Sequence, residues 1–100
     1  MKLTIQSIHF DAADHLKEYI QRKTEKLDTF FDRITDGEVF LKLQNEIKGA
    51  NKLVEMHLRV PGETIIVSKQ GATFEEATDL AVDTLKTQVL KYKSKLQAKA

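Results

Sequence analysis

The chain has 100 residues and a mass of 11.4 kDa, which is the size of one globular domain. It contains no cysteine, which excludes a disulfide scaffold and any thiolate metal or redox site. Its longest apolar runs have three residues, which excludes a transmembrane helix, and its N-terminus lacks the apolar stretch of a signal peptide. We therefore expect one folded domain, located in the cytoplasm.

The charge is small in total but unevenly distributed. Sixteen basic and 15 acidic residues give a formal net charge of +1. Residues 86–100 carry five lysines and no acid, so residues 1–85 hold 11 bases and 15 acids, a net charge of −4. A basic segment of this kind suggests an anionic partner, with nucleic acid the first candidate. The alternative is a solvated helix end whose cations complement the helix dipole.

The first third of the chain predicts a strand followed by a helix. Apolar and polar residues alternate over residues 2–10, which predicts a strand. Asp11 is then placed to cap a helix of about 20 residues, whose apolar residues recur at helical spacing as far as Phe30 and Phe31. Thr35-Asp36-Gly37 predicts the turn that ends the connection.

The rest of the chain predicts three strands and a second helix. Alternation predicts strands over residues 38–44, 54–60 and 64–68, with turns at 48–51 and 61–62. Thr73 and Glu76 form a capping box that opens the helix. The apolar residues of this helix lie in one stripe roughly 60° wide: Phe74, Thr78, Ala81, Leu85, Val89, Tyr92 and Leu96.

The element order β-α-β-β-β-α predicts an α+β fold. Each strand has one apolar side and each helix one apolar stripe, which favours a four-stranded mixed sheet with two helices packed on one face. The helical crossover makes the first two strands parallel. The other sheet face is mixed in character and carries Phe40, Leu53 and Ile66 as a candidate interaction patch.

No residue pattern typical of an active site is present. His9, His15 and His57 lie in different elements without metal-ligand spacing, and only a pocket joining His9 to His15 would point to an enzyme. No serine has a nucleophile-elbow context, and the glycines are too scattered for a phosphate loop. We therefore predict no enzymatic activity, no cofactor, no metal, no small-molecule substrate and no membrane contact.

The basic residues are more informative once they are placed on helices. Neighbouring helices are expected to join five of them into a basic strip suited to phosphate contacts: Arg22, Lys23, Lys26, Lys91 and Lys95. Lys86 and Lys93 lie on the other flank of the second helix. Tyr19 and Tyr92 are placed to stack on bases, and the alternative is that both pack at the edge of the core.

Several segments resemble the ribosome hibernation-promoting factor family, which includes the ribosome-associated translation inhibitors and the sigma-54 modulation proteins. In the first helix these are residues 19–27 (YIQRKTEKL), followed by Phe30-Phe31. In the second helix, residues 77–85 (ATDLAVDTL) resemble the family's Ala-Ile-Asp … Asp-Lys-Leu segment, and residues 90–96 (LKYKSKL) its Lys-Tyr-Lys-x-Lys pattern. A first strand ending in His9-Phe10 also fits, so the resemblance covers essentially the whole chain.

The resemblance implies a domain that binds the small ribosomal subunit between head and body and stops translation in idle cells by filling the decoding region. Its implied contacts to ribosomal RNA are Arg22, Lys23, Lys26, Lys91, Lys93 and Lys95. Lys86 compensates in part for basic residues that the family often has where this chain has Thr84, Thr87 and Leu90. The resemblance also implies a short form without a C-terminal dimerisation domain. Short members either promote ribosome pairing together with a pairing factor, which would be a second partner, or oppose it, and the sequence leaves both alternatives open.

A second hypothesis stays open at this point. The chain would then be a protein-interaction module that modulates a transcription factor through the outer sheet face. Salt-sensitive ribosome association favours the first hypothesis, and salt-insensitive binding to a protein favours the second.

Overall fold

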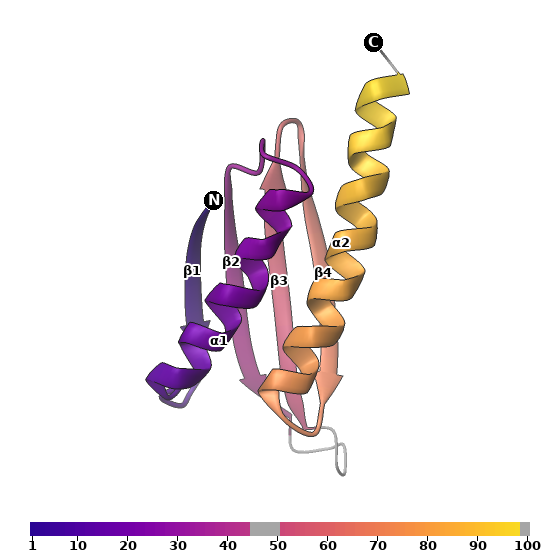
Figure 1. Ribbon diagram of the computed structural model, residues 1–100. Coiled ribbons are helices and arrows are strands. Elements are labelled where there is room, and N and C mark those ends of the chain that lie inside the picture. The colour runs from indigo at the N-terminus through magenta and orange to yellow at the C-terminus, as the bar shows by residue number, and fades with distance from the viewer. Residues whose placement is uncertain (45–50, 99–100) are drawn as a thin grey trace.

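A computed structural model describes residues 1–44 and 51–98, which form seven elements in the predicted β-α-β-β-β-α order (Figure 1). Strand β1 (Lys2–Ser7) leads to helix α1 (Asp14–Glu25), which continues as the short 3₁₀ helix η1 (Lys26–Thr29). Strands β2 (Asp36–Leu43), β3 (Lys52–Val60) and β4 (Glu63–Gly71) follow, and helix α2 (Phe74–Ala98) comes last.

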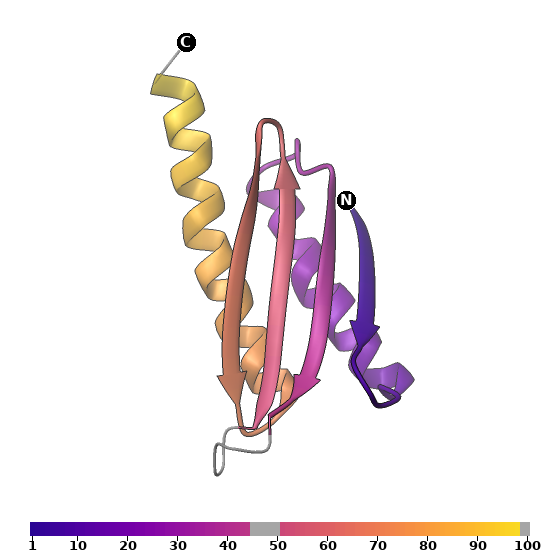
Figure 2. The same cartoon turned by 180° about the vertical axis from the view of Figure 1, so that it is seen from behind.

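The four strands form one mixed sheet in the order β1-β2-β3-β4. β1 runs parallel to β2, whereas β2–β3 and β3–β4 are antiparallel, as the helical crossover and the two strand reversals require. Both helices cover the same face, so that the opposite view shows the bare sheet in front of them (Figure 2). The predicted four-stranded mixed sheet with two helices on one face is confirmed.

The core lies between that sheet face and the helices. Val39, Leu41 and Met56 on the strands are at most 1% exposed, and so are Ile20 on α1 and Leu85 on α2. Burying each such aliphatic side chain stabilises the fold by about 1.5–3 kcal/mol. The predicted stripe of α2 is buried from Phe74 to Tyr92, and Leu96 is half-buried at its end.

The start of α1 differs from the prediction. The helix begins at Asp14 with Ala13 as its N-cap, and no side chain caps it, so the assignment of Asp11 as N-cap is wrong. The chain still pairs with β2 at Ile8, whose amide donates a hydrogen bond of 2.9 Å. His9 then turns the chain with φ 65°, a left-handed conformation that delays the helix.

The turn predicted at residues 35–37 is also wrong in part, because Asp36 and Gly37 already belong to β2. Gly37 is buried, and a Cβ atom there would lie 3.2 Å from a methyl carbon of Leu3 and 3.3 Å from one of Leu58. A glycine at this position therefore leaves room for the Leu3 and Leu58 side chains of the neighbouring strands β1 and β3. Residues 48–50 of another predicted turn lie outside the described residues.

Two local predictions are confirmed. Pro61-Gly62 joins β3 to β4, and Gly62 has a φ of 88°, as the third position of a type II turn requires. The capping box opens α2: the amide of Glu76 donates to Thr73 Oγ1 (3.0 Å), and the Glu76 carboxylate accepts from the amide of Ala72 (3.3 Å).

Candidate nucleic-acid interface

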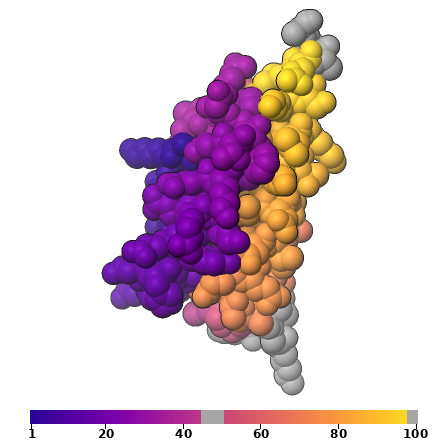
Figure 3. Space-filling view, viewed as in Figure 1, coloured from indigo at the N-terminus to yellow at the C-terminus, as the bar shows by residue number. Residues whose placement is uncertain are grey.

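Helices α1 and α2 lie side by side over the sheet (Figure 3), and a hydrogen bond between side chains joins them. Tyr19 of α1 donates its hydroxyl to Asp79 of α2 at 2.7 Å, and Lys23 Nζ lies 3.7 Å from the same carboxylate. The hydrogen bond to Asp79 is the largest cause that raises the pKa of Tyr19 above its ordinary value of 10.0, followed by burial. Tyr19 therefore keeps its proton and its bond to α2 at neutral pH.

Beside this bond lies a hollow of about 380 Å³ between the two helices, which we call the interhelical furrow. Its main lining residues come from both helices: Lys23, Lys26, Phe30, Asp79, Asp83 and Lys86. Lys86 Nζ sits 4.6 Å from the centroid of the Phe30 ring, a cation–π contact that holds it toward α1. Three lysines against two aspartates leave a formal net charge of +1 in the furrow.

Most of the predicted cations have no carboxylate partner. Of the seven predicted site residues, Lys23 alone forms an ion pair within 4 Å in the described part of the chain. Arg22 is exposed on α1, Lys26 on η1 and Lys86 on α2. The furrow is thus cationic but moderated by Asp79 and Asp83, and its exposed ammonium groups are free to bind phosphate.

The predicted strip is corrected in one respect, because Lys91 and Lys95 do not face α1. They line a separate hollow of about 380 Å³ against Glu63 and Ile66 of β4. At 100° per residue around the helix axis, Lys91 and Lys95 point roughly 160° away from Lys93. Lys91 and Lys95 therefore cannot contact the same neighbouring surface as Lys93.

Lys86 and Lys93, two turns apart, are the cations of α2 that lie toward α1. Lys93 Nζ approaches the carbonyl oxygen of Phe30 at 3.4 Å. Thr87 and Leu90 are exposed between the two flanks, and Thr84 is half-exposed. The three positions where the family often has basic residues therefore carry no charge here.

The two tyrosines have different roles. Tyr92 is 7% exposed, packs edge-on against Phe31 (ring centroids 5.5 Å apart) and donates its hydroxyl to the carbonyl of Pro61. It is a core residue, so base stacking on Tyr92 is excluded and the alternative of edge packing is confirmed. Tyr19 is half-exposed, with Arg22 and Lys23 within 6 Å of its ring centroid.

One basic residue was missed. Arg33, in the connection between η1 and β2, is exposed and lines a hollow that also contains Lys93. The connection that carries Arg33 has no helical or strand periodicity, so the sequence pattern does not predict which way its side chain points. Phe30, which contacts two of the lysines, was predicted only as a core residue.

The outer sheet face is largely polar. Arg59 forms ion pairs with Asp36 and Glu38, and His57 Nε2 lies 2.8 Å from Glu55 Oε2. The guanidinium of Arg59 has a raised pKa because both carboxylates accept hydrogen bonds from it.

The predicted apolar patch on this face is small. Phe40 is half-buried against the His57 ring, and Ile66 is 59% exposed opposite His57 in the sheet. Leu53, predicted as the third member, is 9% exposed. The patch therefore reduces to Phe40 and Ile66.

The structure gives no support for a catalytic or metal site in the described part of the chain. His9 and His15 are both exposed, and no cluster of three or more metal-ligating side chains occurs among the described residues. No helix among these residues is long and apolar enough to span a membrane.

The sequence matches the family described as "Sigma 54 modulation protein / S30EA ribosomal protein" over residues 3–97. The chain belongs to this family. A ribosome hibernation promoting factor from Escherichia coli is 31% identical over 97 residues, covering 97% of this chain and 98% of that protein. One from Azotobacter vinelandii is 28% identical over 95 residues, covering 95% of this chain and 85% of the relative.

Solved structures share the fold. A ribosomal subunit interface protein from Coxiella burnetii superposes with a TM-score of 0.83 at 23% identity, covering 94% of this chain and 99% of that one. The N-terminal domain of Protein Y from Thermus thermophilus gives a TM-score of 0.78 at 26% identity, covering 92% and 99%. The β-α-β-β-β-α arrangement is therefore shared with both of these solved structures.

Proposed function

We propose that this family member is a ribosome hibernation factor that binds ribosomal RNA of the small subunit through the interhelical furrow and silences translation. The observation that carries the proposal is the convergence of cations from two helices on one furrow. Lys26 from η1, directly after α1, and Lys86 from α2 line the same hollow and have no carboxylate within 4 Å among the described residues. The names of the relatives, ribosome hibernation promoting factors, support the same conclusion.

The chemistry of the furrow suits RNA backbone rather than base sequence. Lysine ammonium groups act as point charges toward phosphates, which supplies affinity and position without reading bases. Each neutralised phosphate releases counterions, so binding weakens as salt rises. Arg22, exposed above the Tyr19 ring, extends the same contact surface on α1.

Silencing by occupancy needs no reacting group. The chain extends over 46 × 24 × 18 Å. A folded domain of this size excludes messenger and transfer RNA from any channel it fills. We infer a non-enzymatic action in the cytoplasm, where ribosomes translate. The channel between head and body of the small subunit, the decoding region, is the place we propose for it.

Sucrose-gradient co-sedimentation with purified small subunits tests the proposal. The double variant Lys26→Glu/Lys86→Glu reverses one charge on each side of the furrow, and we expect it to co-sediment much more weakly. Lys17→Glu is the control for a charge reversal outside the furrow, because Lys17 is exposed on the flank of α1 away from α2. The log–log salt slope of the wild type should fall by roughly 1.5 in the double variant, since two phosphate contacts are lost.

Normal co-sedimentation of the double variant would contradict the proposed furrow. A second pair, Lys91→Glu/Lys95→Glu, separates the two flanks of α2. A larger loss from this pair than from the furrow pair would place the RNA against β4 instead.

A further inference from the structure

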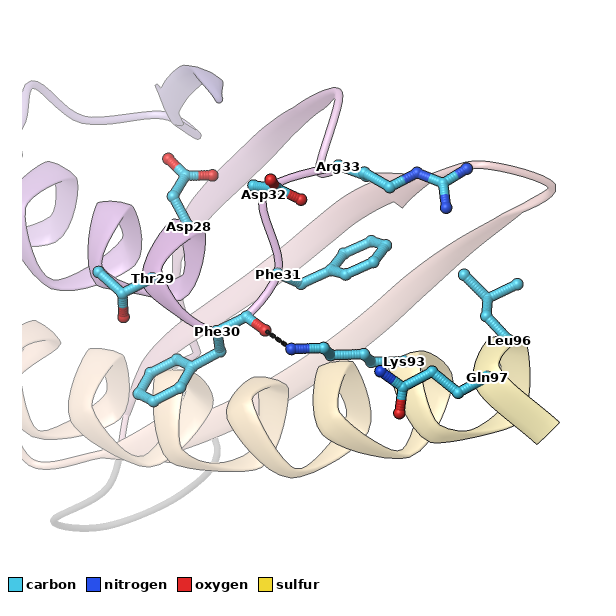
Figure 4. Close-up of a pocket in the computed structure, with 9 residues that line it drawn as sticks. All are labelled: Asp28, Thr29, Phe30, Phe31, Asp32, Arg33, Lys93, Leu96 and Gln97. Atoms are coloured by element: carbon cyan, nitrogen blue, oxygen red, sulfur yellow. Dashed lines mark hydrogen bonds between the residues drawn. The ribbon is translucent and has the colours of Figure 1, made fainter. Parts of the chain in front are cut away.

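A second hollow of about 390 Å³ lies at the end of the two helices. It lies between the connection that follows η1 and the last turns of α2, and we call it the connection pocket (Figure 4). Phe30 lines both hollows, so the connection pocket lies next to the furrow. Its main lining residues are Phe31, Asp32, Arg33, Lys93, Leu96 and Gln97.

The lining combines three kinds of chemistry. The half-buried Leu96 provides the exposed apolar surface, while Phe31 is 6% exposed and packs edge-on against the buried Tyr92 ring. Arg33 and Lys93 extend from opposite sides of the opening (Figure 4). Neither forms an ion pair within 4 Å in the described part of the chain. Asp32 and Gln97 add a carboxylate and an amide.

We propose that the connection pocket binds one unpaired nucleotide of an RNA strand whose backbone follows the furrow. Arg33 and Lys93, on opposite sides of the opening, bind the phosphates on either side of this nucleotide, and the base lies against the half-buried Leu96 above the largely buried Phe31 ring. This inference rests on the proposed function, and it adds recognition of a single-stranded segment to contacts that otherwise involve backbone alone.

The mixed lining argues for a nucleotide over a simple anion. The Asp32 carboxylate repels a bare phosphate ion, but it accepts hydrogen bonds from the imino and amino groups of a base. The volume of about 390 Å³ falls in the range of small-ligand sites, and unpaired RNA is typically recognised by apolar or aromatic contact with the base plus charge on the backbone. A duplex cannot present a base in this way.

The test measures binding of a six-nucleotide single-stranded RNA, the same RNA as a duplex, 5′-AMP and inorganic phosphate. Affinity is read by fluorescence anisotropy, and location by NMR shifts of the Gln97 side-chain amide. Arg33→Glu is compared with Lys17→Glu, which makes the same charge change far from the pocket. We expect Arg33→Glu to weaken single-strand binding about tenfold, duplex binding far less, and Lys17→Glu neither.

If Arg33→Glu and Lys17→Glu weakened single-strand binding equally, the proposal that the connection pocket binds a nucleotide would be overturned. It would also be overturned if inorganic phosphate shifted Gln97 as much as the RNA does, or if 5′-AMP bound and the RNA strand did not. The proposed function is judged separately by co-sedimentation of the wild type. If the protein binds the small subunit but the connection pocket binds no single-stranded RNA, only the nucleotide proposal is refuted. If the pocket binds single-stranded RNA but the protein does not bind the subunit, only the proposed function is refuted.

Discussion

We predict that removing the negative charge of Asp79 strengthens RNA binding. Its carboxylate accepts the hydrogen bond from Tyr19, pairs with Lys23 at 3.7 Å and lines the furrow as a negative charge. Asp79→Asn keeps the shape and still accepts a hydrogen bond from Tyr19, but it removes the charge. The formal net charge of the furrow rises from +1 to +2, because three lysines then face one aspartate. RNA should bind this variant more tightly.

The size of the gain follows from distances in the furrow. A phosphate bound to Lys23 would lie about 6.5 Å from Asp79, which is the 3.7 Å ion-pair distance plus a charge-assisted hydrogen bond of about 2.8 Å. Repulsion at that distance is about 0.6 kcal/mol in water and about 2.6 kcal/mol at an effective dielectric of about 20. The Asp79 side chain is 48% exposed, which favours the lower end. We expect a gain of roughly three- to tenfold in affinity.

The assay is equilibrium binding of purified small subunits at several salt concentrations. Tyr19→Phe is the control, because it removes the hydrogen bond between the helices without changing any charge, and its affinity should stay near that of the wild type. The gain of Asp79→Asn should shrink as salt rises. Unchanged or weaker binding of Asp79→Asn, with an intact fold, would refute the assignment of the furrow as the RNA contact.

Three further outcomes follow from the fold. Thr73→Ala removes the oxygen that accepts from the Glu76 amide at 3.0 Å, and should lower the free energy of unfolding by about 1 kcal/mol in chemical denaturation. No loss would mean that the capping box does not stabilise α2. Leu85→Ala empties a fully buried site, and should cost about 2–5 kcal/mol in the same assay. A loss under 1 kcal/mol would contradict the packing. The hydrogen bond to Asp79 raises the pKa of Tyr19 above 10.0, so its contribution to stability is complete below pH 10 and is lost as the pH rises through the folded-state value. Ultraviolet titration should show a lower tyrosine pKa in Asp79→Asn, and an unchanged titration would contradict the bond.

Hydrophobic periodicity predicted the fold well. The alternation in residues 2–10 and in the later strands, and the stripe from Phe74 to Leu96, each reflect burial against one shared core. Element ends were less predictable, since they depend on tertiary pairing. Asp36 and Gly37 look like turn residues, yet pairing on both sides draws them into β2.

The interface was only partly predictable. The apolar stripe defines which side of α2 is buried, but its two flanks are equivalent until the neighbours of the helix are known. Because α2 lies over β3 and β4 with α1 on one side, Lys86 and Lys93 face the furrow while Lys91 and Lys95 lie toward β4. Arg33 was not predicted, because residues between η1 and β2 follow no repeating pattern.

Site-directed photocrosslinking on the small subunit tests the central claim most directly, namely that the face with the two helices contacts ribosomal RNA. A benzophenone amino acid replaces Thr87, exposed on α2 next to the furrow lysine Lys86, or Thr4, exposed on the outer sheet face. The account predicts crosslinks to small-subunit ribosomal RNA from position 87 and none from position 4. RNA crosslinks from position 4 with none from position 87 would contradict it.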